Sequence, residues 1–150
     1  MNIEGNPTSI RPAAPVPRRP LAIVYVAMAA IALAIAAVLE VGGLRSPEIA
    51  DAGPVPFILT VIAGALAAWA ASFGAGVVGG TLTGFAYGLG GGIVQAFAPG
   101  SAMPLLAVVT AVFLMTILGA LFGGLGAIPF AIIRWRQKKK LAWNGRTRNG

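Results

Sequence analysis

The chain contains no cysteine and no histidine among its 150 residues. Disulfide bonds, thiolate nucleophiles, haem ligation by histidine and zinc sites built from these residue types are therefore excluded. Charged residues are also scarce, because Asp, Glu, Lys and Arg together make up 10% of the chain, whereas soluble domains carry roughly 25%. So few charges cannot cover the surface of a water-soluble domain of this length.

Hydrophobic residues make up 57% of the sequence, and the few charges are segregated from them. Between positions 21 and 133 the only charged side chains are those of Glu40, Arg45, Glu48 and Asp51. The remaining charges lie in the two ends of the chain. This distribution predicts an all-α integral membrane protein, because apolar helices cross a bilayer while charges stay at its surfaces.

The first predicted span covers residues 21–41, an almost unbroken apolar run. About 20 helical residues cross the roughly 30 Å hydrocarbon core. A cleaved signal peptide is the alternative, because Arg18 and Arg19 precede the run and residues 34–36 (Ala-Ile-Ala) resemble a small-x-small cleavage site. The run is longer than the usual apolar region of about 7 to 15 residues, which favours a span. Residues 42–56 are rich in Gly, Pro and charge and predict a loop.

Residues 55–98 carry no charged side chain and would measure about 66 Å as one helix, twice the thickness of the membrane core. This segment must therefore fold back. We predict the turn near residues 74–80 (GAGVVGG), because it leaves about 19 residues on each side. The second and third spans are then about 56–75 and 80–98. A re-entrant segment over residues 76–98 is the alternative, since protein-buried irregular backbone is tolerated inside a membrane.

The last predicted span covers residues 105–133 and contains Pro129, so a tilt or a kink between Gly123 and Pro129 would fit it into the bilayer. Residues 1–20 are predicted to form a disordered Pro/Arg-rich arm, and residues 134–150 a basic tail. These assignments predict a transmembrane helical domain over residues 21–133, a bundle of four transmembrane helices.

Every Lys and Arg except Arg45 lies before the first span or after the last one. The positive-inside rule therefore predicts that both termini are cytoplasmic, in what we interpret as a bacterial inner membrane. An even number of crossings agrees with this orientation. The basic and aromatic residues that follow the last span are predicted to contact anionic lipid headgroups rather than nucleic acid, because they adjoin an apolar span. They are Arg134, Trp135, Arg136, Lys138, Lys139 and Lys140.

A small residue occurs at every fourth position from Gly64 to Gly100. The five central members of this series are glycines, and the last span repeats the spacing. This pattern resembles the glycine zipper found in many unrelated membrane proteins, and it predicts close helix packing. The packing could be within one chain or face a second subunit, and the stripe could also line a narrow path or act as a hinge. The predicted helix-packing residues are Gly76, Gly80, Gly84, Gly88, Gly92, Gly119 and Gly123.

Two polar residues are candidates for chemistry within the spans. Glu40 ends the first span and is interpreted as a solvated interfacial carboxylate, with cation or proton binding as the alternative. Gln95 carries an amide that is costly to bury alone, so we predict an interhelical hydrogen bond, with a place on a solute path as the alternative. The sequence contains no paired carboxylates, Ser-His constellation, metal cluster or phosphate loop. It therefore predicts no enzyme activity, no metal site and no cofactor.

The function predicted from this architecture is that of a non-catalytic accessory or assembly subunit. Its packing faces and basic, lipid-facing tail suit a protein that joins a larger membrane complex or forms a homo-oligomer. A pore-forming protein of the holin type is one alternative, since such proteins are also small, span the membrane several times and end in a basic tail. A small transporter or channel is the other.

Overall fold

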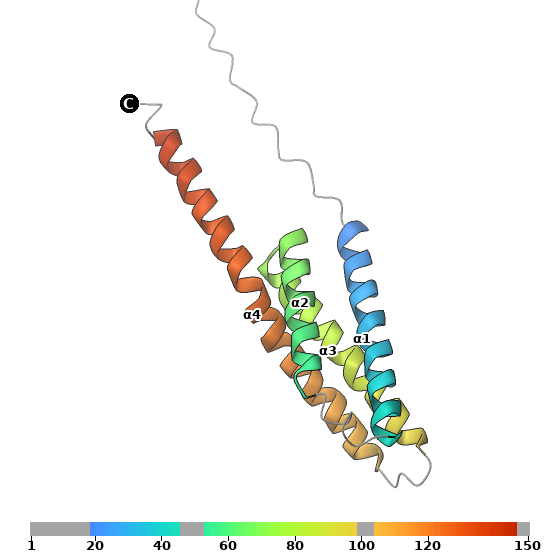
Figure 1. Cartoon of the computed structure of the whole chain (residues 1–150). Helices are drawn as coiled ribbons and strands as arrows, with labels where there is room; N and C mark the ends of the chain where they lie inside the picture. The colour runs from blue at the N-terminus through green and yellow to red at the C-terminus, as the bar shows by residue number, and fades with distance from the viewer. Residues whose placement is uncertain (1–18, 46–52, 99–103, 147–150) are drawn as a thin grey trace, which may run out of the picture.

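The computed structural model describes residues 19–45, 53–98 and 104–146, which form four helices (Figure 1). They are α1 (Arg19–Arg45), α2 (Val55–Ala70), α3 (Phe73–Phe97) and α4 (Leu105–Arg146). The predictions for residues 1–18 of the N-terminal arm, for residues 46–52 of the predicted loop and for residues 147–150 of the tail lie outside the described residues. The described part of the chain is all-helical, as the sequence predicts.

Three of the helices are long and apolar enough to cross a membrane: Leu21–Gly42 within α1, Phe73–Phe97, and Leu105–Lys139 within α4. The chain is accordingly a membrane protein. Helix α2 is different, because its 16 residues measure about 24 Å, less than the roughly 30 Å of the hydrocarbon core. The second helix is therefore apolar but shorter than a full span.

The turn between α2 and α3 lies at Ala71 and Ser72, and the predicted turn at residues 74–80 is wrong. Ser72 is extended (φ −159°, ψ 169°), and its hydroxyl accepts a hydrogen bond from the Ala75 amide at 3.2 Å. This serine thus caps the N-terminus of α3. Glycines 74, 76, 79 and 80 follow inside the helix. Glycine often marks a turn, which is why the sequence predicts the α2–α3 turn a few residues too late.

One alternative and two further boundaries given by the sequence analysis also differ from the structure. Residues 73–97 form one continuous helix of 25 residues, so the re-entrant alternative for residues 76–98 is wrong. Helix α1 continues to Arg45, so the first four residues of the predicted loop at 42–56 are helical. Helix α4 continues to Arg146, so the last helix does not end at residue 133 and includes the basic segment that follows.

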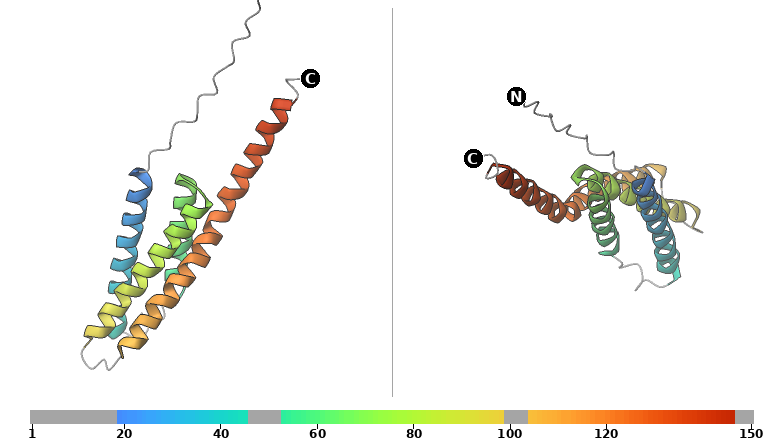
Figure 2. Two further views of the ribbon diagram at one scale, coloured as in Figure 1. Left: turned by 180° about the vertical axis from the view of Figure 1, so that it is seen from behind. Right: turned by 90° about the horizontal axis from the view of Figure 1, so that it is seen from above.

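Helix α3 occupies the centre of the bundle and packs against α1, α2 and α4 (Figure 2). Helix α1 also touches α2, whereas α1 and α4 have no contact with each other in the described residues. We call the end of the bundle that holds the α2–α3 turn the basic end, because the basic residues of α4 extend beyond it. The opposite end, where α1 and α3 end and α4 begins, is the distal end (Figure 1).

The most extensive helix contact, between α3 and α4, is made by glycines on both sides. A Cβ added to Gly123 would lie 2.6 Å from the Cα of Gly80, and one added to Gly119 would lie 3.0 Å from the Cα of Gly84. Real Cβ atoms essentially never show the first distance, and the second is tighter than most of their contacts. The two backbones are therefore in direct contact, and a side chain at these positions would push the helices apart.

The remaining predicted packing glycines of α3 extend this contact in both directions. A Cβ at Gly88 would lie 3.0 Å from the Cα of Val112 on α4, and one at Gly92 would lie 2.7 Å from a methyl carbon of Val108. Toward the basic end, a Cβ at Gly76 would lie 2.7 Å from the carbonyl oxygen of Gly64 on α2. Helix α3 therefore makes close contacts along four turns with helices of the same chain.

A matched pair of neighbouring glycines on α4 tests this packing. Gly123→Ala places a methyl group against Gly80 and should lower stability by about 1–3 kcal/mol, the usual cost of overpacking. Gly124→Ala meets only ordinary contact, with a Val77 methyl carbon at 3.7 Å, and should leave stability unchanged or slightly raised. Thermal unfolding of both variants in the same detergent measures the difference. Equal melting temperatures would contradict the close contact.

The orientation predicted by the charges can be tested because the chain has no cysteine. Gly74 is exposed beside the α2–α3 turn, where a Cβ would meet the Ser72 hydroxyl oxygen at 3.9 Å. In intact cells, Gly74→Cys and Asn144→Cys should resist a membrane-impermeant maleimide, whereas Pro104→Cys at the distal end should react. Labelling of Gly74→Cys and Pro104→Cys from the same side would contradict the arrangement.

Candidate functional site

The two polar residues that the sequence singles out meet between α1 and α3. The Gln95 side-chain amide donates a hydrogen bond to Glu40 Oε2 at 2.6 Å. The interhelical hydrogen bond predicted for Gln95 is thus present, and its partner is the only carboxylate in the described residues. Both side chains are half-buried. Among the basic side chains that the structure describes, which do not include that of Arg45, none forms an ion pair with Glu40.

Gly91 allows the carboxylate of Glu40 to lie against α3. A Cβ at Gly91 would lie 3.2 Å from Glu40 Oε1, closer than most real contacts of a Cβ atom, and 3.5 Å from its Cγ, an ordinary contact distance. Gly90 does the same for the α1 backbone, since a Cβ there would lie 2.9 Å from the carbonyl oxygen of Leu33. The glycine-rich end of α3 therefore brings α1 close enough for the Glu40–Gln95 bond to form.

A cavity of about 220 Å³ opens beside this hydrogen bond. Three of its lining residues, Glu40, Gln95 and Tyr87, have polar side chains, and the others are glycines or apolar residues. The lining residues are Glu40 of α1; Tyr87, Gly88, Gly91, Gly92 and Gln95 of α3; and Val108, Ala111 and Met115 of α4.

The short length of α2 leaves room for this cavity. The ring of Phe57, near the start of α2, packs against that of Phe122 on α4 in a tilted arrangement, with 4.8 Å between centroids and 47° between the ring planes. The cavity is bounded on α4 by Val108, Ala111 and Met115, which lie two to four turns closer to the distal end. No residue of α2 lines it. The backbones of α1 and α4 lie apart, so the cavity lies between these two helices, with α3 as its third wall.

The hydroxyl groups inside the helices are satisfied locally, as expected for Ser and Thr in membrane helices. Thr81, Thr83, Thr110 and Thr116 each donate to the carbonyl oxygen four residues earlier, at 2.7–2.8 Å. Buried side-chain nitrogen and oxygen atoms without a partner are absent from the described residues. These threonines therefore contribute no free polar group to a site.

Arg134 has an internal role that the sequence did not indicate. Its guanidinium donates hydrogen bonds to the carbonyl oxygens of Ala71 and, at 2.9 Å, of Trp69. These carbonyls belong to the C-terminal end of α2, where backbone acceptors lack helical partners and the helix dipole favours a cation. Arg134 thus fastens the α2–α3 turn to α4. Its predicted contact with lipid headgroups stays a prediction.

The other residues predicted at the headgroups lie on the part of α4 beyond Arg134. Trp135, Arg136, Lys138 and Lys139 are exposed, and the Lys139 ammonium lies 3.8 Å from the centre of the Trp135 ring, a cation–π contact. Lys140 continues the helix, and its side chain lies outside the described residues. Their interaction with lipid remains a prediction.

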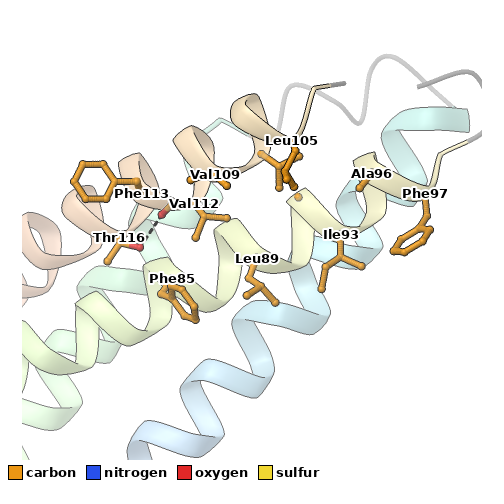
Figure 3. A pocket seen from close by; sticks show the side chains of 12 residues that line it. Phe85, Leu89, Ile93, Ala96, Phe97, Leu105, Val109, Val112, Phe113 and Thr116 are labelled. Atoms are coloured by element: carbon orange, nitrogen blue, oxygen red, sulfur yellow. Dashed lines mark hydrogen bonds between the residues drawn. The ribbon is translucent and has the colours of Figure 1, made fainter. Parts of the chain in front are cut away.

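A second hollow lies on the surface of the α3–α4 pair, toward the distal end (Figure 3). This groove has a volume of about 640 Å³ and an almost wholly apolar lining. Its one polar side chain, Thr116, already donates to the Val112 carbonyl oxygen. The lining residues are Phe85, Leu89, Gly92, Ile93, Ala96 and Phe97 of α3, and Leu105, Val108, Val109, Val112, Phe113 and Thr116 of α4.

Comparison of the chain with protein-family models, with curated proteins and with solved structures found no significant match. A grouping of three or more His, Cys, Asp or Glu side chains that could hold a metal ion is absent from the described residues. The candidate sites that the geometry provides are the polar cavity and the apolar groove.

Two contacts were not predicted from the sequence: the place of Tyr87 in the lining of the polar cavity and the bonds of Arg134 to the end of α2. Tyr87 joins Glu40 and Gln95 in the lining of the cavity. It lies eight residues before Gln95, which places the two about 80° apart around α3, so the spacing carries only a weak signal that they share a face. The Arg134 contact carries no such signal, because it links residues more than 60 positions apart.

The cap made by Arg134 is testable with a matched arginine two residues away. Arg134→Met removes the donors and should lower stability by about 1.5–3 kcal/mol, as expected for hydrogen bonds from a charged group. Arg136→Met changes the same charge at an exposed position and should have little effect. Melting temperatures in detergent compare the two. A loss of equal size in both variants would show that only the total charge matters.

Proposed function

We propose that the chain is a non-catalytic membrane protein that serves as an accessory or assembly subunit, and that its α3–α4 groove holds an apolar transmembrane helix of a partner subunit. The observation that carries the proposal is the groove itself. It is concave, apolar and walled by two helices whose glycine contacts hold them together. Association inside a membrane depends on van der Waals contact, which a concave surface increases.

The hollow shape of the groove, with large apolar side chains on its walls, supports this function. Phe97 and Leu105 are 84% and 78% exposed, and Phe113 is 66% exposed. In lipid, large apolar side chains can remain exposed without penalty, so exposure alone does not require a partner. What distinguishes this surface is its hollow shape. Phenylalanine side chains have few rotamers, so they can offer a large area for contact with a partner while losing little conformational entropy, as at many protein interfaces.

The glycine series supports packing within the chain, in the manner of a glycine zipper, more than packing between copies. The glycines at 76, 80, 84, 88 and 92 are all buried and contact helices of the same chain. A second copy would have to displace α4 to use the same stripe. We therefore propose that a partner subunit docks on the groove and that four helices, with both termini in the cytoplasm, form the scaffold that presents it.

Site-specific photocrosslinking tests this function. A photoreactive amino acid at Val109, which lines the groove and is 56% exposed, should give a discrete adduct with another membrane protein in native membranes. The same amino acid at Val38 is the matched control, because that valine is 70% exposed on α1, away from the groove. It should give no discrete adduct.

The outcomes separate the partner from its alternatives. An adduct of twice the mass of the chain would indicate a homo-oligomer in place of the proposed partner. Equal, diffuse crosslinking at both positions would mean that lipid fills the groove, and the proposal would be wrong. The pore-forming alternative predicts loss of membrane potential on induced expression, which an accessory subunit should not cause.

A further inference from the structure

We propose that the cavity between α1, α3 and α4 is a binding site for a small organic ammonium ion, with Glu40 as its counter-ion. This inference concerns a different surface from the α3–α4 groove and does not depend on a partner subunit. It rests on the charge, the hydrogen-bonding groups and the shape of the cavity.

The charge in the cavity calls for a cation. Glu40 supplies the only formal charge among the lining residues, and they include no lysine or arginine. Its Oε2 accepts from Gln95, but an amide provides only a partial positive charge. A carboxylate in an apolar environment is costly without a counter-ion, and carboxylates in membrane helices commonly serve a bound cation.

Oxygen atoms beside the carboxylate remain free for a ligand. Because the side-chain N–H of Gln95 donates to Glu40, the side-chain carbonyl oxygen of Gln95 is left as an acceptor. The Tyr87 hydroxyl also has no hydrogen-bond partner within the described residues. Neither this oxygen nor the Gln95 carbonyl oxygen is a buried atom that lacks a partner. An ammonium N–H could therefore bond to Glu40 and to one of these oxygens.

The rest of the lining favours an organic cation over a metal ion. Calcium takes 6 to 8 oxygen ligands and magnesium demands an octahedral set, whereas three side chains in this cavity carry oxygen. The remaining walls are glycine, Val108, Ala111 and Met115. These apolar and polarisable surfaces suit alkyl groups, and the Tyr87 ring offers a face for a cation. A volume of about 220 Å³ limits the ligand to a small one.

Binding of ethylammonium, which carries both N–H donors and an alkyl group, to the full-length protein in lipid nanodiscs tests the proposal by calorimetry. The wild type should bind it saturably, and an excess of sodium should not compete. Glu40→Gln removes the charge but keeps an oxygen that can accept from Gln95, and it should weaken binding at least tenfold. Glu48→Gln makes the same change eight positions later and should bind like the wild type.

A second variant keeps the test decisive if Glu40→Gln fails to fold. Ala111→Leu adds bulk to an exposed position of the lining while the carboxylate remains, so the protein should stay folded and bind at least tenfold more weakly. Three results would overturn the proposal: no saturable binding by the wild type, equal affinity in Glu40→Gln or in folded Ala111→Leu, or full competition by sodium, which would indicate an inorganic cation site.

Discussion

Direct contact between the backbones of α3 and α4 is the constraint on which the rest of the structure depends. Gly80 and Gly84 face Gly119 and Gly123, and no side chain separates the two helices at these points. In lipid, little hydrophobic force drives helices together, so the stability of the pair comes from such close van der Waals contact. The same contact fixes α3 in the centre, where it can also meet α1 and α2.

The central position of α3 decides where the two hollows lie. On one side the α3–α4 pair forms the apolar groove, and on the other side α1 and α4 stand apart above α3. Near the basic end α2 contacts both α3 and α4, with Gly64 against Gly123. Toward the distal end α2 is missing because it begins only at Val55. The polar cavity occupies that region and collects Glu40, Tyr87 and Gln95 from two helices.

Local signals in the sequence predicted much of the fold correctly. The long uncharged runs indicated helices of membrane-spanning length, and the need for a fold-back within residues 55–98 followed from length alone. The position of that turn could not be predicted in the same way. Gly74 to Gly80 suggest a break by propensity, yet they are helical because packing against α2 and α4 overrides the intrinsic cost of glycine. The true turn depends on one serine cap and on Arg134, an arginine from a distant helix.

The amino-acid sequence by itself determined the membrane class, the helical content and the two candidate polar residues, Glu40 and Gln95. These features depend on composition and on spacing along the chain. Only the tertiary structure decided that Gln95 bonds to Glu40, that Tyr87 joins them, and that α2 is too short to close the space beside them. Those facts depend on how far each helix extends relative to its neighbours. That relative position is set by contacts between residues far apart in the chain, and no local pattern records it.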